Sequence, residues 1–136
     1  MNWPAIVVAT LIPTIVGAIW YNPKVLGNYW LRANNTTAEA MRGGNMPLIY
    51  VAALALSFFL AMFVHQNVTG PGQEAERFGT FQHGMVHGTA LILFIVLPIL
   101  GTSALFERRG WNWLLVNVGY WWITLMIMGG ILSLWR

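Results

Sequence analysis

The three histidines are the side chains of this chain best suited to chemistry. His83 and His87 lie four residues apart, a spacing that places two imidazoles on one face of a helix. Together with His65 they offer three nitrogen ligands to a tetrahedral metal ion and leave one position open. The same cluster would titrate near neutral pH and so act as a proton sensor. A third interpretation is structural, because the amphipathic imidazole ring is common where apolar segments meet water.

A second candidate group lies in the middle of the last apolar stretch and consists of Asn117, Tyr120, Trp121 and Trp122. Tryptophan normally lies at membrane interfaces, so two of them near the centre are unusual. Adjacent residues of a helix point about 100° apart, so Trp121 and Trp122 do not face the same partner. One of them would line a pocket for a flat apolar ligand, unless both are simply large packing residues. Asn117 is expected to donate a hydrogen bond to another helix.

Composition excludes several other kinds of site. The chain has no cysteine, which removes disulfides, thiolate metal sites and cysteine nucleophiles. It also lacks the motifs of serine hydrolases, phosphate-binding loops and dinucleotide-binding folds. No Lys, Arg, Asp or Glu interrupts the long apolar stretches, which argues against ion-coupled transport. We therefore predict that the chain is not an enzyme.

Hydrophobicity sets the elements that position these residues. Apolar residues make up 57% of the 136-residue chain and charged residues only 8%, whereas a soluble domain has about 25% charged residues. A helix that crosses a membrane needs about 20 apolar residues, and in lipid its backbone groups must satisfy one another. We predict one all-α membrane domain, residues 1–136, built as a bundle of four transmembrane helices. The predicted spans are residues 3–21, 47–68, 83–106 and 112–135.

Basic residues predict how this bundle is inserted, because Lys and Arg in short loops favour the cytoplasmic side. The first and third loops carry five of the seven basic residues: Lys24, Arg32, Arg42, Arg108 and Arg109. The opposite side carries only Arg77 and Arg136. We therefore predict that both termini lie outside. The net charge of +3 is interpreted as a topology signal, and no nucleic-acid partner is expected.

The first loop is long and contains its own pattern. Residues 23–33 mix apolar, aromatic and basic side chains, which predicts a short amphipathic helix at the membrane interface. Thr36 and Glu39 have the spacing of a capping box, which predicts one more helical turn over residues 37–42. Gly43 and Gly44 would end that turn.

Small residues predict where the helices pack. Lipid tails are as apolar as leucine, so membrane helices associate where small side chains let backbones approach. Such positions recur on the predicted first, third and fourth spans: Ala5, Ala9, Pro13, Gly17, Gly84, Gly88, Gly129 and Gly130. The second span carries Ala53, Ser57 and Ala61. Pro13 and Pro98 lie within spans, where each removes a backbone hydrogen bond and favours a kink.

Two segments resemble a known family. One is Gly17-Ala18-Ile19-Trp20-Tyr21-Asn22-Pro23 with Gly27 and Trp30, and the other is Asn117-Val118-Gly119-Tyr120 with Met128-Gly129. Together they resemble the bacterial membrane family named domain of unknown function 1761, over about residues 5–135. The resemblance implies four spans and a long first loop, and it implies no function. Its first element suits an interfacial anchor made of Trp20, Tyr21, Pro23 and Trp30. The histidines are not part of the pattern.

These observations predict a non-enzymatic membrane module of the bacterial cytoplasmic membrane, which associates with copies of itself or with a larger membrane complex. A small homo-oligomeric channel or carrier is the alternative, with a polar path lined by Thr10, Thr14, Ser57 or Asn117. A metal-binding or pH-sensing protein that uses the outer-face histidines is the third. No resident cofactor is predicted beyond a candidate metal ion or apolar ligand such as a lipid, quinone or carotenoid. The expected partners are the lipid bilayer and either further copies of this chain or a larger membrane complex.

Overall fold

The computed structural model describes residues 1–136 and contains helices and loops without strands. Four helices are long and apolar enough to cross a membrane: Trp3–Trp20, Met46–Thr69, Phe81–Phe106 and Trp111–Leu134. They confirm the predicted four-helix membrane bundle. The elements are α1 (Trp3–Trp20), α2 (Gly27–Ala33), η1 (Ala40–Arg42), α3 (Met46–Thr69), η2 (Glu76–Phe78), α4 (Phe81–Leu91), η3 (Ile92–Val96), α5 (Leu97–Phe106) and α6 (Trp111–Leu134).

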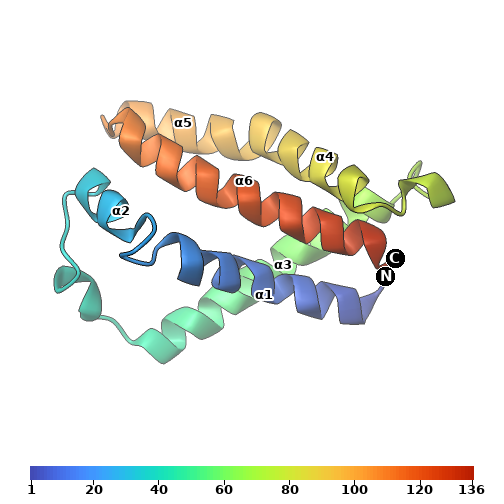
Figure 1. Cartoon of the computed structure of the whole chain (residues 1–136), viewed down its shortest axis with the longest axis horizontal. Helices are drawn as coiled ribbons and strands as arrows, with labels where there is room; N and C mark the ends of the chain where they lie inside the picture. The colour runs from blue at the N-terminus through green and yellow to red at the C-terminus, as the bar shows by residue number, and fades with distance from the viewer.

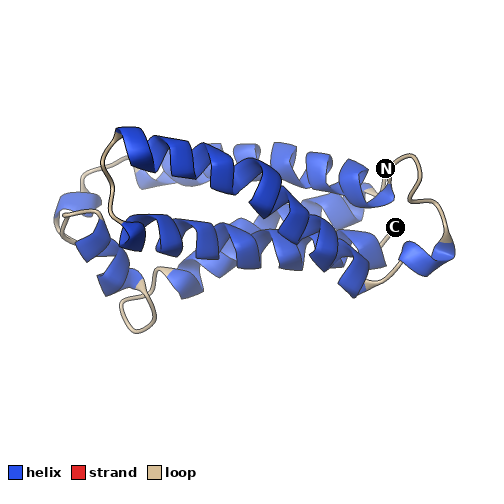
Figure 2. Cartoon of the chain, turned by 90° about the horizontal axis from the view of Figure 1, so that it is seen from above, coloured by secondary structure: helices blue, strands red, loops and turns tan.

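Helix α6 lies at the centre of the bundle and contacts each of the other long helices (Figure 1). Helices α4 and α5 run along one side of it, α1 runs along the other, and α3 crosses obliquely behind α1 (Figure 1). Both termini lie at the end where α3 finishes and α4 begins. The short helices occupy the two ends of the bundle, with α2 and η1 at one and η2 at the other (Figure 2).

Polar caps place the starts of these helices. The side chain of Asn2 accepts a hydrogen bond of 3.1 Å from the backbone N–H of Ala5. Asn45 caps α3 in the same way, and Thr80 caps α4 through the N–H of His83. Such caps satisfy backbone donors that the first turn leaves free. Three of the four long apolar spans, those that begin with α1, α3 and α4, therefore start at a side-chain cap.

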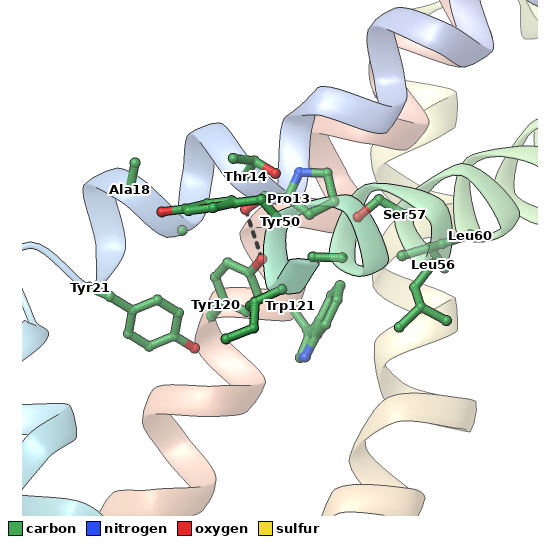
Figure 3. Close-up of a pocket in the computed structure, with 13 residues that line it drawn as sticks. Pro13, Thr14, Ala18, Tyr21, Tyr50, Leu56, Ser57, Leu60, Tyr120 and Trp121 are labelled. Atoms are coloured by element: carbon green, nitrogen blue, oxygen red, sulfur yellow. Dashed lines mark hydrogen bonds between the residues drawn. The ribbon is translucent and has the colours of Figure 1, made fainter. Parts of the chain in front are cut away.

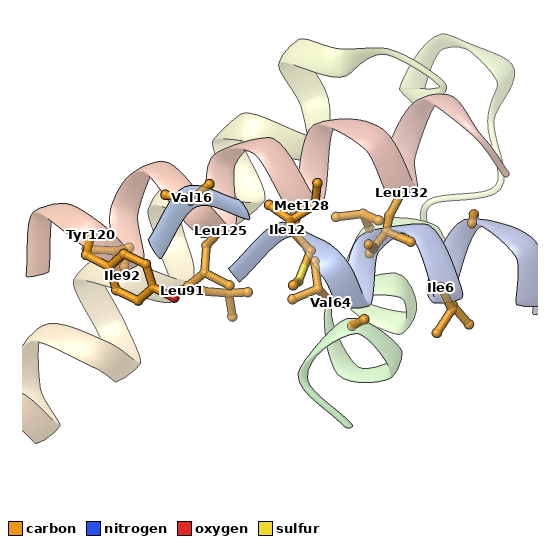
Figure 4. Packing of buried hydrophobic residues seen from close by; sticks show 14 residues of the cluster. Ile6, Ile12, Val16, Val64, Leu91, Ile92, Tyr120, Leu125, Met128 and Leu132 are labelled. Atoms are coloured by element: carbon orange, nitrogen blue, oxygen red, sulfur yellow. The ribbon is translucent and has the colours of Figure 1, made fainter. Parts of the chain in front are cut away.

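The core is concentrated toward the end that carries the termini. Ile6, Val64, Leu125, Met128 and Leu132 are buried there between α1, α3 and α6 (Figure 4). The small side chains of the first span serve the predicted purpose, since Ala5 and Ala9 are completely buried. The first and last spans thus pack through residues near the two chain ends.

Helices α4 and α6 approach most closely at their glycines. A Cβ atom added to Gly84 would overlap the backbone of Gly129, and one added to Gly88 would overlap the backbone at Leu125. The ring of Phe81 occupies the space beside Gly130. Backbone therefore lies directly against backbone here, as small residues permit in membranes.

The third span contains a wide turn just before its proline. Residues Ile92–Val96 form a π-helical turn, and Pro98 follows at the start of α5. Proline has no N–H and its ring crowds the carbonyl of the residue four positions earlier. A π turn relieves that crowding by inserting one extra residue into the helix. The predicted irregularity at Pro98 thus appears as a π-bulge inside a continuous span.

The first loop contains the predicted short helix, α2, but the capping-box prediction was wrong. The N–H of Thr36 bonds to the carbonyl of Leu31, and Asn35 adopts a positive φ of 51°. Both features end α2, so Thr36 belongs to that helix terminus. Thr37 accepts the bond from Ala40 instead, and the following turn is the short 3-10 helix η1.

Candidate functional site

A groove opens between α1, α3 and α6 on the side of the molecule and encloses about 710 Å³ (Figure 3). We call it the lateral groove. Its residues are Pro13, Thr14, Gly17, Ala18, Tyr21, Ile49, Tyr50, Ala53, Leu56, Ser57, Leu60, Tyr120 and Trp121. The lining contains hydroxyl groups but no Lys, Arg, Asp, Glu or His. This surface is suited to binding an apolar partner.

The groove exists because the first half of α3 diverges from the bundle, whereas its second half packs against the core. Ala61, Val64 and Val68 in the second half of α3 are completely buried against the core. In the first half, by contrast, Val51 is 65% exposed and Leu56 is 71% exposed. Every residue from Met46 to Ala53 is exposed, so the first third of this helix is only loosely packed within the chain.

Tyr120 forms the floor of the lateral groove. Its hydroxyl donates a buried hydrogen bond of 2.8 Å to the carbonyl of Pro13, drawn as a dashed line in Figure 3. Its ring lies 5.1 Å from the ring of Tyr21 and 4.9 Å from that of Trp121. These contacts join α1 to α6 and hold three aromatic rings along one wall.

The end of α1 is fastened to α6 just beside this floor. The indole Nε1 of Trp20 donates a bond of 3.1 Å to the carbonyl of Val116. The same indole ring covers Gly119, where an added Cβ would lie 3.0 Å from the ring. Even an alanine at position 119 would tighten this contact, and the indole of Trp20 would have to shift by a few tenths of an ångström.

The residues predicted to form an interfacial anchor continue this arrangement into α2. Tyr21 meets the ring of Trp30 edge-on at 5.5 Å. Gly27 opens α2 against the carbonyl of Tyr21, where an added Cβ would overlap. Trp30 thus contacts Tyr21, and Tyr21 contacts Tyr120. Residues about a hundred positions apart in the chain form one continuous contact in this way.

The family model described as "Protein of unknown function (DUF1761)" matches residues 4–133. The chain belongs to this family. No curated protein and no solved structure matches it. The family assignment predicted from the Trp20-Tyr21 and Gly119-Tyr120 segments is confirmed, and in this DUF1761 chain the two segments pack against each other.

The aromatic residues predicted on α6 divide between two environments. Trp121 lines the lateral groove, whereas Trp122 is 46% exposed and donates a hydrogen bond to the hydroxyl of Thr89. This division follows from their helical separation. Asn117 does not make the expected bond to another helix. Its amide donates to the carbonyl of Trp113 one turn earlier, the nearest acceptor that its short side chain can reach.

The predicted histidines do not converge on one point. His83 and His87 pair with ring centres 4.4 Å apart, and His87 is bonded at 2.7 Å to the Asn67 side chain. His65 lies instead against Asn2 and Thr69. No set of three His, Cys, Asp or Glu side chains is placed to hold a metal ion. The physical reason is the helical period, since residues 65 and 67 of α3 point to nearly opposite sides.

Sequence reasoning did not find the other walls of the groove. Tyr120 and Trp121 were predicted as pocket residues, but Ile49, Tyr50 and Leu56 were not. Residues 46–56 of α3 are apolar on every face, so their sequence carries no periodic signal that separates a groove wall from a lipid-facing surface.

Proposed function

We propose that this chain is a non-enzymatic membrane module that associates with a second copy through the lateral groove. The supporting observation is the first half of α3, which forms one wall of the groove and leaves every residue from Met46 to Ala53 exposed. Association of membrane helices depends on close packing, because lipid and side chains are equally apolar. A half-helix without such contacts is a natural site for a second chain.

The character of the two walls favours a helix from an identical chain. Gly17 and Ala18 line the groove from α1, and Ala53 and Ser57 line it from α3. Small side chains of this kind allow a neighbouring backbone to approach. Each chain carries both the groove and the exposed half of α3, so a two-fold contact would satisfy both at once.

Single cysteines test this proposal, because the natural chain has none. Val51→Cys and Leu56→Cys place a thiol on the exposed half of α3, and a short bismaleimide in native membranes should join two copies. Phe94→Cys and Leu105→Cys are matched controls on other helices, with exposed fractions of 79% and 78%. Equal cross-linking at all four positions would show random collision and overturn the proposal.

A second candidate function is the binding of a small apolar ligand such as a lipid, quinone or carotenoid. It is favoured by the aromatic floor at Tyr120 and Trp121, and the groove volume of about 710 Å³ falls within the usual range for ligand sites. Native mass spectrometry of gently released protein separates the two. A dimer without added mass supports association, and a monomer with a bound ligand supports the second candidate.

The channel alternative has less support from the geometry. Thr14 and Ser57 line the lateral groove, but the hydroxyl of Thr10 bonds to the carbonyl of Ile6 and Asn117 bonds to its own helix. Two of the four polar side chains expected to line the path are therefore hydrogen-bonded to the backbone of their own helix, and only the other two line the groove. A flux assay in liposomes with no transport above empty vesicles would end this alternative.

We further propose that both termini face outside across the bacterial cytoplasmic membrane, as the loop charges predict. Glu74→Cys places a thiol at the end of the bundle that carries both termini, and Glu39→Cys places one in the first loop. In intact cells, a membrane-impermeant maleimide should label position 74 and reach position 39 only after permeabilisation. The reverse pattern would invert the orientation.

A further inference from the structure

A second groove runs between α5 and α6 and shares no residue with the lateral groove. We call it the α5–α6 groove. It encloses about 460 Å³ and its lining includes Leu97, Pro98, Gly101, Leu105, Arg109 and Trp111. One end is apolar, and the other ends at a basic loop. The groove is therefore apolar at one end and positively charged at the other, which complements a ligand with an apolar tail and an anionic headgroup.

The wide turn before Pro98 is followed by a looser contact between the two helices. Before that turn, the glycines of α4 lie directly against the backbone of α6. After it, Ala104 is the only residue of α5 that is buried. A Cβ added to Gly101 would meet no atom within 4 Å, so the space beside it is open.

Arg109 lies at the charged end with most of its donors free. Its Nε donates to Glu107 at 2.9 Å, in an ion pair whose side chains are 38% and 52% exposed. The two terminal nitrogens of Arg109 donate no hydrogen bond within the chain, and its guanidinium lies 5.6 Å from the ring centre of Trp113. An exposed ion pair of this kind holds Arg109 weakly. Its terminal N–H groups remain available to a phosphate.

We propose that the α5–α6 groove binds one anionic phospholipid. The phosphate would bond to Arg109, and an acyl chain would lie along Leu97, Gly101 and Leu105. Phosphate is the acceptor that a guanidinium fork matches best, and lipid phosphates lie at the depth where a span ends. The exposed Trp111 belongs to the same interfacial layer.

The chain provides its own matched groove for comparison. A third groove, beside α4 and α6, also encloses about 460 Å³ and is lined by Met85, Val86, Ala90 and Leu93 among others. It contains no charged residue. A groove without a cation cannot select an anionic headgroup. Lipid bound in this third groove therefore measures binding that depends on the acyl chains alone.

The test uses the full chain in detergent, delipidated and then given phosphatidylglycerol or phosphatidylcholine, with bound lipid counted by native mass spectrometry. We expect one tightly bound phosphatidylglycerol. Arg109→Gln should reduce its affinity about fivefold, whereas Arg108→Asn removes the same charge outside the groove and should change it little. Gly101→Leu should also weaken binding by filling the groove, and Ala90→Leu, which fills the uncharged groove, should not.

Equal losses in Arg108→Asn and Arg109→Gln would show attraction by net charge alone and overturn the proposal. Unchanged binding in Gly101→Leu would also overturn it, since the acyl chain would then lie elsewhere. Displacement of the lipid by millimolar inorganic phosphate would reassign Arg109 to a simple anion site. Thermal unfolding of each variant, expected within a few degrees of the natural chain, separates these outcomes from misfolding.

Discussion

The hydroxyl of Tyr120 donates a hydrogen bond of 2.8 Å to the backbone carbonyl of Pro13, and so joins the middle of α6 to α1. The bond is buried beneath the lateral groove. Within a bilayer no water replaces a lost partner, so this contact holds the two helices in register. It also keeps the Tyr120 ring against Tyr21, the residue at which α1 ends.

Removal of this hydroxyl should loosen the bundle. We expect Tyr120→Phe to lower the free energy of unfolding by about 1 kcal/mol, because a buried polar bond is lost and the ring volume is kept. Unfolding in mixed micelles, followed by circular dichroism, measures the change. Tyr50→Phe is the control, since Tyr50 is 53% exposed and its hydroxyl makes no hydrogen bond. Equal stability of the two variants would show that the bond contributes nothing.

The contact between α4 and α6 should be sensitive to a single methyl group. A Cβ at Gly84 would overlap the backbone of Gly129, which has no rotamer by which to move aside. We expect Gly84→Ala to cost about 2 kcal/mol or more, as overpacking does. Gly101→Ala is the matched control, because its Cβ meets nothing within 4 Å and alanine favours a helix. A control as unstable as Gly84→Ala would rule out the packing explanation.

The position of α2 should depend on Gly27. A Cβ there would overlap the carbonyl of Tyr21, so Gly27→Ala should displace α2 and break the edge contact between Tyr21 and Trp30. Trypsin should then cleave faster after Lys24 and Arg32, because a loosened segment opens more often. Gly43→Ala has open space at its Cβ and should leave the cleavage rate unchanged.

The bond between His87 and Asn67 should couple α3 to α4. Its atoms, His87 Nδ1 and Asn67 Oδ1, lie 2.7 Å apart. In a double-mutant cycle with alanine at both positions, we expect a coupling energy of about 0.5–1.5 kcal/mol. His65→Ala paired with Asn67→Ala should give no coupling, since His65 contacts Asn2 and Thr69 instead. Additive effects of His87→Ala and Asn67→Ala would contradict the prediction.

The predicted metal role of the histidines has a direct check. Alanine at both His83 and His87 should abolish bound metal if the pair is a ligand site, as the sequence spacing suggested. Metal content measured by elemental analysis decides it. The same content in the double variant and the natural chain would leave the pair with a structural role.

The four spans could be predicted because hydrophobicity is a local property of the sequence. Each helix boundary lies within a few residues of its predicted one, since caps such as Asn45 and Thr80 stand directly before the apolar runs. The family was also predictable, from the Trp20-Tyr21 and Gly119-Tyr120 segments. Sequence spacing correctly marked Gly84, Gly88 and Gly129 as packing positions, because only small residues permit that contact.

The sequence by itself therefore determined what crosses the membrane, where each helix begins, and which positions are small enough for close contact. Only the tertiary structure decided which of those positions meet. The separation of His65 from His87, the bond of Asn117 within its own helix and the free half of α3 all depend on helix rotation and crossing angle. Uniformly apolar helices carry little periodic information about rotation, so packing between distant segments sets it.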